Sequence, residues 1–154
     1  MSDSKRTFGS VKNASRNQQS VDLTTAQQML PLVRSIVRDI VEKSDELERL
    51  QPEQARLESH RRELEWQERE RRYTVNDQIS SIESEYKKIL EELRSLGISL
   101  IDAKVGRVAF PTKIHGRPAM FTWQPDEDNV GYWNYEDEET RHPIPTEWQS
   151  NSTK

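Results

Sequence analysis

The chain has 154 residues, of which 32% are hydrophobic and 32% are charged, and 23 Lys and Arg against 27 Asp and Glu give a net charge of −4. Because a typical globular chain is roughly 45–50% apolar, this composition excludes a large two-layer core and favours long, solvated helices. The absence of cysteine excludes a disulfide framework and a thiol nucleophile, and no run of about 18 apolar residues could span a membrane.

The first stretch of the chain, residues 1–20, is rich in Ser, Asn and Gln, with Phe8 and Val11 as its only sizeable apolar residues after the initial Met. Too little apolar surface is present to offset the entropy of ordering the backbone, so we expect a disordered N-terminal tail. The stretch also lacks the apolar core of a secretory signal, which favours a cytoplasmic location.

A helix is expected to follow, with Asp22 as its N-cap. Beyond this cap, apolar residues recur at alternating spacings of four and three, which places them in one narrow stripe of the kind found in a coiled-coil seam. The stripe consists of Ala26, Leu30, Val33, Val37, Ile40 and Leu47.

A second stripe with the same alternation predicts a second helix, which ends where Gly97 can adopt the left-handed conformation of a helix terminus. Two such stripes in one short chain predict an antiparallel, coiled-coil-like helical hairpin over residues 21–96. The second stripe consists of Val75, Ile79, Ile82, Tyr86, Ile89, Leu93 and Leu96.

The hairpin tip lies somewhere within residues 51–73, and matched arm lengths favour residues 59–65. A turn at Pro52 is an alternative, because proline suits the first position of a new helix. A helix start at Thr74, with Asp77 in an approximate capping box, is another. The expected apolar anchors of this stretch are Leu57, Leu64 and Trp66.

After Gly97 the pattern becomes alternating, and short strands are expected over residues 98–101, 107–110, 119–123 and 130–135. They predict a small antiparallel sheet over residues 97–136, followed by an acidic, irregular tail over residues 137–154. The fold class is therefore α+β, a long helical hairpin with a sheet appended at its C-terminal end. The expected turns are at Gly106, Pro111, His115-Gly116 and residues 125–129.

Aromatic residues dominate the last two strands. If Gln124 pairs with Asn129, Phe121 faces Tyr132 on one side of the sheet, and this side packs on the helices. The other side would be uncovered, which suggests contact with a protein partner or with a second copy. A register slip of one residue would exchange the two sides. The candidate interaction residues on the uncovered side are Met120, Trp133 and Tyr135.

Arginines near the hairpin tip suggest nucleic-acid binding as the alternative function. Phosphate binding favours cations without neighbouring anions, and glutamates at four positions between residues 63 and 70 nearly cancel the positive charge. The alternative is therefore the weaker one. Its candidate residues are Arg61, Arg62, Arg69, Arg71 and Arg72.

No catalytic, cofactor or metal constellation stands out. The three histidines, at positions 60, 115 and 142, lack metal-ligand spacing. The acidic cluster Asp126-Glu127-Asp128 lies on an expected turn, where carboxylates stay ionised and serve chain reversal. Phosphate-binding and nucleophile motifs are also absent from the sequence. We therefore expect no enzymatic activity, no cofactor and no metal.

Several short motifs, in this order and spacing, resemble the prokaryotic domain-of-unknown-function family 2203 over residues 21–144. The resemblance implies a helical hairpin with a small sheet and implies no activity. Members of that family usually carry an acid at position 109 and a His at position 134, where this chain has Ala109 and Asn134, so it is identified as a divergent member. The matching motifs are Ala26-x-x-x-Leu30-Pro31-x-Val33, Leu96-Gly97, Gly106-x-Val108-x-Phe110-Pro111, His115-Gly116-Arg117, Trp123 and Tyr132-Trp133.

Together these features predict a non-catalytic protein-interaction module. Self-association through the helical hairpin or the aromatic side of the sheet is one form that this interaction could take.

Overall fold

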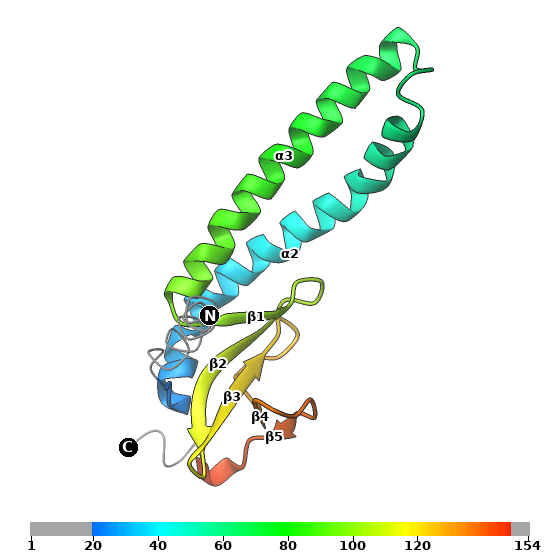
Figure 1. Ribbon diagram of the computed structural model, residues 1–154. Coiled ribbons are helices and arrows are strands. Elements are labelled where there is room, and N and C mark those ends of the chain that lie inside the picture. Colours follow the sequence, from blue (N-terminus) through cyan, green and yellow to red (C-terminus); the bar gives the residue numbers. More distant parts are fainter. Residues whose placement is uncertain (1–19, 149–154) are drawn as a thin grey trace, which may run out of the picture.

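The structure is a computed structural model that describes residues 20–148. A long helical hairpin rises from an antiparallel sheet (Figure 1), so the predicted α+β fold class is confirmed. The expected N-terminal tail up to residue 19, and residues 149–154 of the expected C-terminal tail, lie outside the described residues. Within the described part, no helix combines the length and the apolar character that a membrane span requires.

Helix α2 (Leu23–Ser59) begins at the predicted cap, because a side-chain oxygen of Asp22 accepts a hydrogen bond of 2.7 Å from the backbone N–H of Thr25. The helix continues through Pro52, so the alternative turn there is wrong. Pro52 lies on the exposed side of the helix, where water can satisfy the carbonyl group that loses its helical partner.

Helix α3 (Trp66–Ser95) returns antiparallel to α2, and residues 60–65 form the turn, within the favoured stretch. Thr74 lies inside α3, so the helix does not begin there. At the other end, Gly97 has φ +83°, and its N–H donates to the carbonyl of Arg94 (2.8 Å) while the N–H of Ile98 donates to that of Leu93 (3.4 Å). This pattern is a Schellman motif, as the glycine predicted.

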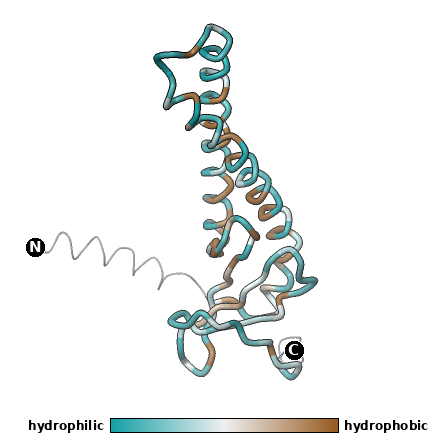
Figure 2. The backbone as a smooth tube through the Cα atoms, turned by 90° about the vertical axis from the view of Figure 1, so that its right-hand side faces the viewer, coloured by the Kyte–Doolittle hydropathy of each residue, from teal (hydrophilic) through white to brown (hydrophobic). Residues whose placement is uncertain are grey.

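Both predicted stripes face inward, and Figure 2 shows hydrophobic residues recurring along both helices among hydrophilic ones. The helices share two apolar clusters, one against the sheet and one near the tip. We call residues 47–79, the end of the hairpin that holds the second cluster, the arm (Figure 1). The buried residues of the arm cluster are Leu57, Leu64, Val75 and Ile79, with Leu47 and Leu50 packed against them.

The sheet has five antiparallel strands in sequential order. The fifth strand lies in the stretch that we expected to be irregular. Ile144 explains the difference, because its side chain is buried and its N–H donates to the carbonyl of Gly131 (2.9 Å), which fixes the chain beside the sheet. The strands are β1 (Ser99–Asp102), β2 (Arg107–Ile114), β3 (Arg117–Trp123), β4 (Tyr132–Tyr135) and β5 (His142–Pro143).

Strand β2 runs through Pro111, where we expected a turn. Strand β1 pairs only with residues 107–109 of β2, so beyond them this side of β2 has no neighbouring strand. The carbonyl of Pro111 points to that side and accepts a hydrogen bond from the N–H of Val21 (2.7 Å). Because the N–H and the carbonyl of one strand residue point the same way, the N–H that proline lacks would have had no strand partner.

The register between β3 and β4 differs by one residue from the expected one, since Phe121 pairs with Trp133 and Thr122 with Tyr132. Val130 does not pair with Trp123. Its backbone instead exchanges two hydrogen bonds with the side-chain amide of Gln27 on α2, at 3.1 and 3.0 Å. Helix α2 thus draws Val130 away from the ladder, and the slip that we had considered as an alternative is the observed register.

Candidate functional site

The register separates the three sheet residues that we expected on one uncovered side. Trp133 and Tyr135 lie on the helix-facing side, opposite Phe121 and Ala119, whereas Met120 lies on the other side, opposite Asn134. The expectation of one shared surface is therefore wrong. A role for each side chain in binding stays a prediction.

Trp133 lies at the centre of an aromatic cluster. The ring centroids of Tyr135, His142 and Trp148 lie 4.9, 4.8 and 5.5 Å from that of Trp133. These distances are typical of packed aromatic pairs. The C-terminal segment of the described chain therefore covers much of the aromatic surface that the sequence left open to a partner.

Tyr135 is held by polar groups from the β2–β3 turn. Its hydroxyl lies 3.0 Å from Nδ1 of His115, and the guanidinium of Arg117 lies 3.7 Å from the centre of its ring. Arg117 also pairs with Asp137 at 3.1 Å. The hydroxyl group and one face of the ring are thus engaged within the chain itself.

Among the described residues, Glu138 and His142 most resemble a catalytic acid–base pair. A carboxylate oxygen of Glu138 lies 2.8 Å from Nε2 of His142. The N–H of Tyr135, which donates to Glu138, and the neighbouring His142 lower the pKa of this carboxyl below its ordinary value. A carboxylate that stays ionised serves as a hydrogen-bond acceptor here. Among residues 20–148, no three His, Asp or Glu side chains converge as metal ligands would.

The opposite side of the sheet carries a polar network around Arg141. Its guanidinium donates to Thr122 (2.8 Å) and, through two nitrogens, to Glu127 (2.9 and 3.1 Å), and it lies 4.3 Å from the centre of the Tyr132 ring. The side chains of Arg141 and Glu127 are only 19% and 16% exposed. The acidic turn residue Glu127 is therefore committed to an ion pair.

Three of the five tip arginines pair with glutamates of α2. Arg71 reaches Glu53 at 2.6 Å, and both Arg72 (2.9 Å) and Arg61 (3.3 Å) reach Glu58. Their partners are thus not the glutamates at positions 63–70 that the sequence suggested. Arg71 and Arg72 hold α3 against α2, and binding of phosphate by them would compete with these contacts.

Acidification is expected to loosen the arm. Hydrogen bonds from Arg71 and Arg72 lower the pKa values of Glu53 and Glu58 below the ordinary 4.5. Since the pKa is lower in the folded chain, this stabilisation is present above pH 4.5 and is lost as the pH falls further. Amide exchange between about pH 6 and pH 3 should reveal an early loss of protection in residues 47–79.

The matched control for this pH effect is the double variant Glu53→Gln with Glu58→Gln. Its arm should show no such selective loss, because glutamine does not titrate. Equal protection of the native arm at both pH values would contradict a role of these ion pairs in holding the arm.

The structure also reveals an aromatic pair on the arm. Trp66 and Tyr73 are 64% and 65% exposed. We expected Trp66 to be an anchor of the hairpin core, which is wrong. Nine residues, or about two and a half helical turns, separate Trp66 from Val75 in the seam, so the two side chains lie on opposite sides of α3. Extending the second stripe backwards would have revealed this from the sequence.

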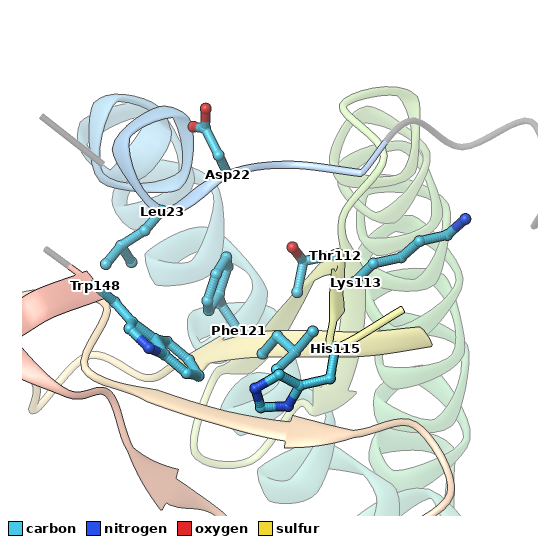
Figure 3. Close-up of a pocket in the computed structure, with 8 residues that line it drawn as sticks. Asp22, Leu23, Thr112, Lys113, His115, Phe121 and Trp148 are labelled. Carbon is cyan, nitrogen blue, oxygen red and sulfur yellow. The ribbon is translucent and has the colours of Figure 1, made fainter. Parts of the chain in front are cut away.

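A cavity of about 350 Å³ lies where the start of α2 meets the β2–β3 turn (Figure 3). Its apolar walls come from α2, the sheet and the end of the described chain, and a threonine and a histidine add polar atoms. The sequence analysis did not identify this cavity, because its lining residues are scattered along the chain. They include Leu23, Thr112, Ile114, His115, Phe121 and Trp148.

Comparison with known proteins gives one match. The model of a family described as uncharacterized conserved protein (DUF2203) matches residues 20–144 of the chain. No curated protein and no solved structure matches it.

Proposed function

Since the chain belongs to the DUF2203 family, as its sequence motifs predicted, and the description of that family names no activity, we propose a function from the geometry. The protein is a non-catalytic interaction module that binds a protein partner through the outer side of its arm.

The exposed pair of Trp66 and Tyr73 carries this proposal. The two residues are seven positions apart on α3, so they lie on the same side of the helix, and each is about two-thirds exposed. Tryptophan and tyrosine are enriched at protein interfaces and among the residues that contribute most to binding energy. Large aromatic groups on an otherwise polar helix side have no role in the hairpin core, which supports a role in binding.

The arm presents this pair on a rigid support. Behind it, Val75 and Ile79 pack with Leu57 and Leu64 in the arm cluster, and Arg71 and Arg72 bind the glutamates of α2. A preorganised surface loses less conformational entropy on binding, which raises affinity.

Two other observations favour a protein partner on the arm over the alternatives. Several tip arginines are already in ion pairs, which disfavours a nucleic-acid partner. Trp133 and Tyr135 contact residues of their own chain, which disfavours the sheet as the main interface.

Site-specific photocrosslinking in cells tests the proposal. A photoreactive phenylalanine analogue replaces Trp66 or Tyr73, and matched probes replace Gln67 or Thr74, which have the same spacing on the adjacent side of α3. We expect discrete adducts from positions 66 and 73 that resist nuclease, and none of these adducts from 67 and 74. An adduct of twice the mass of the chain would identify the partner as a second copy. Equal labelling at all four positions, no adduct, or nuclease-sensitive adducts would refute the proposal.

The double variant Trp66→Ala with Tyr73→Ala is expected to weaken binding of the crosslinked partner by at least about tenfold, since interface aromatics often contribute more than 1.4 kcal/mol each. The free energy of unfolding should change by no more than about 0.5 kcal/mol, because both side chains are exposed. Calorimetry with the purified partner and urea denaturation measure the two effects. Gln67→Ala with Thr74→Ala is the control and should leave both unchanged.

A further inference from the structure

The cavity at the start of α2 has the size and the walls of a small-molecule site. Its volume of about 350 Å³ lies at the lower end of the range for ligand pockets, which suits a molecule of one or two rings. Leu23, Ile114, Phe121 and Trp148 form its apolar walls. Figure 3 shows Leu23 of α2, Phe121 of β3 and Trp148 near the end of the described chain around the same open hollow.

Thr112 places an unpaired hydroxyl group in this apolar setting. The residue lines the cavity and is only 9% exposed, yet its hydroxyl has no hydrogen-bond partner within residues 20–148. By contrast, the other deeply buried threonine of the sheet, Thr122, accepts a hydrogen bond from Arg141. No buried side-chain oxygen or nitrogen of the described residues lacks a hydrogen-bond partner, so the hydroxyl of Thr112 is reached from the open side of the cavity. This hydroxyl is therefore available to a ligand as a hydrogen-bonding group.

His115 adds a second polar atom at the exposed edge of the cavity. It is the only residue other than glycine in the described chain with a positive φ, 56°, in the tight turn between β2 and β3. Asn or Gly would suit this turn better. Nδ1 of the ring lies 3.0 Å from the Tyr135 hydroxyl, which leaves Nε2 without a partner in the described chain. The ring thus offers both a flat wall and a hydrogen-bonding group.

The charges around the cavity lie at its rim. Figure 3 shows the side chains of Asp22 and Lys113 pointing away from the hollow between Leu23, Phe121 and Trp148. The carboxylate of Asp22 is also engaged by the N–H of Thr25. The cavity therefore offers aromatic and aliphatic walls with a hydroxyl group and an imidazole as hydrogen-bonding groups.

We infer that this cavity binds an uncharged planar aromatic molecule that carries a hydrogen-bonding group, of the size of a phenol or an indole. The ring packs among Phe121, Trp148 and His115, and its polar group bonds the hydroxyl of Thr112. This inference is independent of the arm, which lies at the far end of the hairpin (Figure 1).

Methyl NMR of the full-length protein tests the inference. Phenol and indole are titrated separately, and the signals of the methyl groups of Leu23 and Ile114 are followed. We expect saturable shifts of these signals for both probes and weaker binding for cyclohexanol, which has the hydroxyl but no planar ring. N-acetyltryptophan amide, as a further probe, distinguishes an aromatic side chain of a peptide from a free small molecule as the source of the ring.

Two variants that preserve the fold sharpen the test. Thr112→Val keeps the shape and removes the hydroxyl, and His115→Asn suits the turn and removes the ring. Each is expected to weaken binding of phenol on the order of tenfold without lowering the thermal midpoint. Thr122→Val is the matched control: it should lower the midpoint, because Arg141 loses a partner, and leave binding unchanged.

Saturable binding that depends on Thr112 and His115 but not on Thr122 supports the inference. The inference is overturned if neither phenol nor indole shifts the signals saturably. It is also overturned if Thr112→Val and His115→Asn bind phenol as the native chain does, or if cyclohexanol binds as tightly as phenol.

Discussion

Replacing Gly106 by alanine is expected to lower the free energy of unfolding by about 2–4 kcal/mol, the sum of about 1 kcal/mol for the unfavourable φ and 1–3 kcal/mol for overpacking. Gly106 has φ +79°, and a Cβ atom there would lie 2.7 Å from Val37, 3.0 Å from Val41 and 3.1 Å from Pro125. The valines belong to α2, so this contact seats the β1–β2 turn on the hairpin. Urea denaturation followed by circular dichroism measures the loss.

Gly116→Ala separates the two causes. Gly116 has nearly the same φ, +77°, but a Cβ atom there would meet nothing within 4 Å. Its replacement should therefore cost only about 1 kcal/mol, the price of the backbone conformation. Equal losses at positions 106 and 116 would contradict the view that close approach to α2 requires the glycine.

Replacing Gln27 by leucine is expected to lower the free energy of unfolding by about 2–6 kcal/mol. It leaves the buried N–H and carbonyl of Val130 without partners, at about 1–3 kcal/mol for each unsatisfied group. The amide of Gln27 donates to the carbonyl of Val130 and accepts from its N–H, and Val130 is fully buried. Leucine keeps the helix propensity and the approximate size of the side chain. The effect therefore reports the lost hydrogen bonds and is measured by urea denaturation.

The control is Gln28→Leu, one residue further along α2, where the side chain is exposed. Its free energy of unfolding should change by no more than about 0.5 kcal/mol. NMR of the Gln27→Leu variant should also show altered signals in β4, because the contact with Val130 sets the position of that strand against β3. Unchanged β4 signals together with unchanged stability would contradict this role of Gln27.

The hairpin could be predicted from the sequence because its determinants are local. Helical periodicity placed both seams, Asp22 marked the start of α2 and Gly97 the end of α3, and the structure confirms all of these. The turn at residues 60–65 also lies where matched arm lengths placed it. Each of these features depends on residues a few positions apart, which any folded form of the segment must satisfy.

The candidate sites could be predicted only in part. Trp66 was assigned to the core because it is large and apolar, although its helical phase places it opposite the seam. The partners of Arg71 and Arg72 lie 18 and 14 residues away, across the hairpin, where the sequence offers nearer glutamates. The unpaired hydroxyl of Thr112 could not be predicted, because the sequence does not show whether the hydroxyl of a threonine has a hydrogen-bond partner.

Local sequence patterns thus predict the two helices, their caps and the presence of a short antiparallel sheet, because hydrophobic periodicity and turn residues act over a few positions. The register of β4, the fifth strand and the cavity depend instead on contacts between distant parts of the chain. Gln27 and Val130 are 103 residues apart, and a side chain so distant can satisfy a backbone group that the local pattern assigns to a neighbouring strand. Every buried backbone group needs a partner, but only the assembled fold decides which partner is within reach.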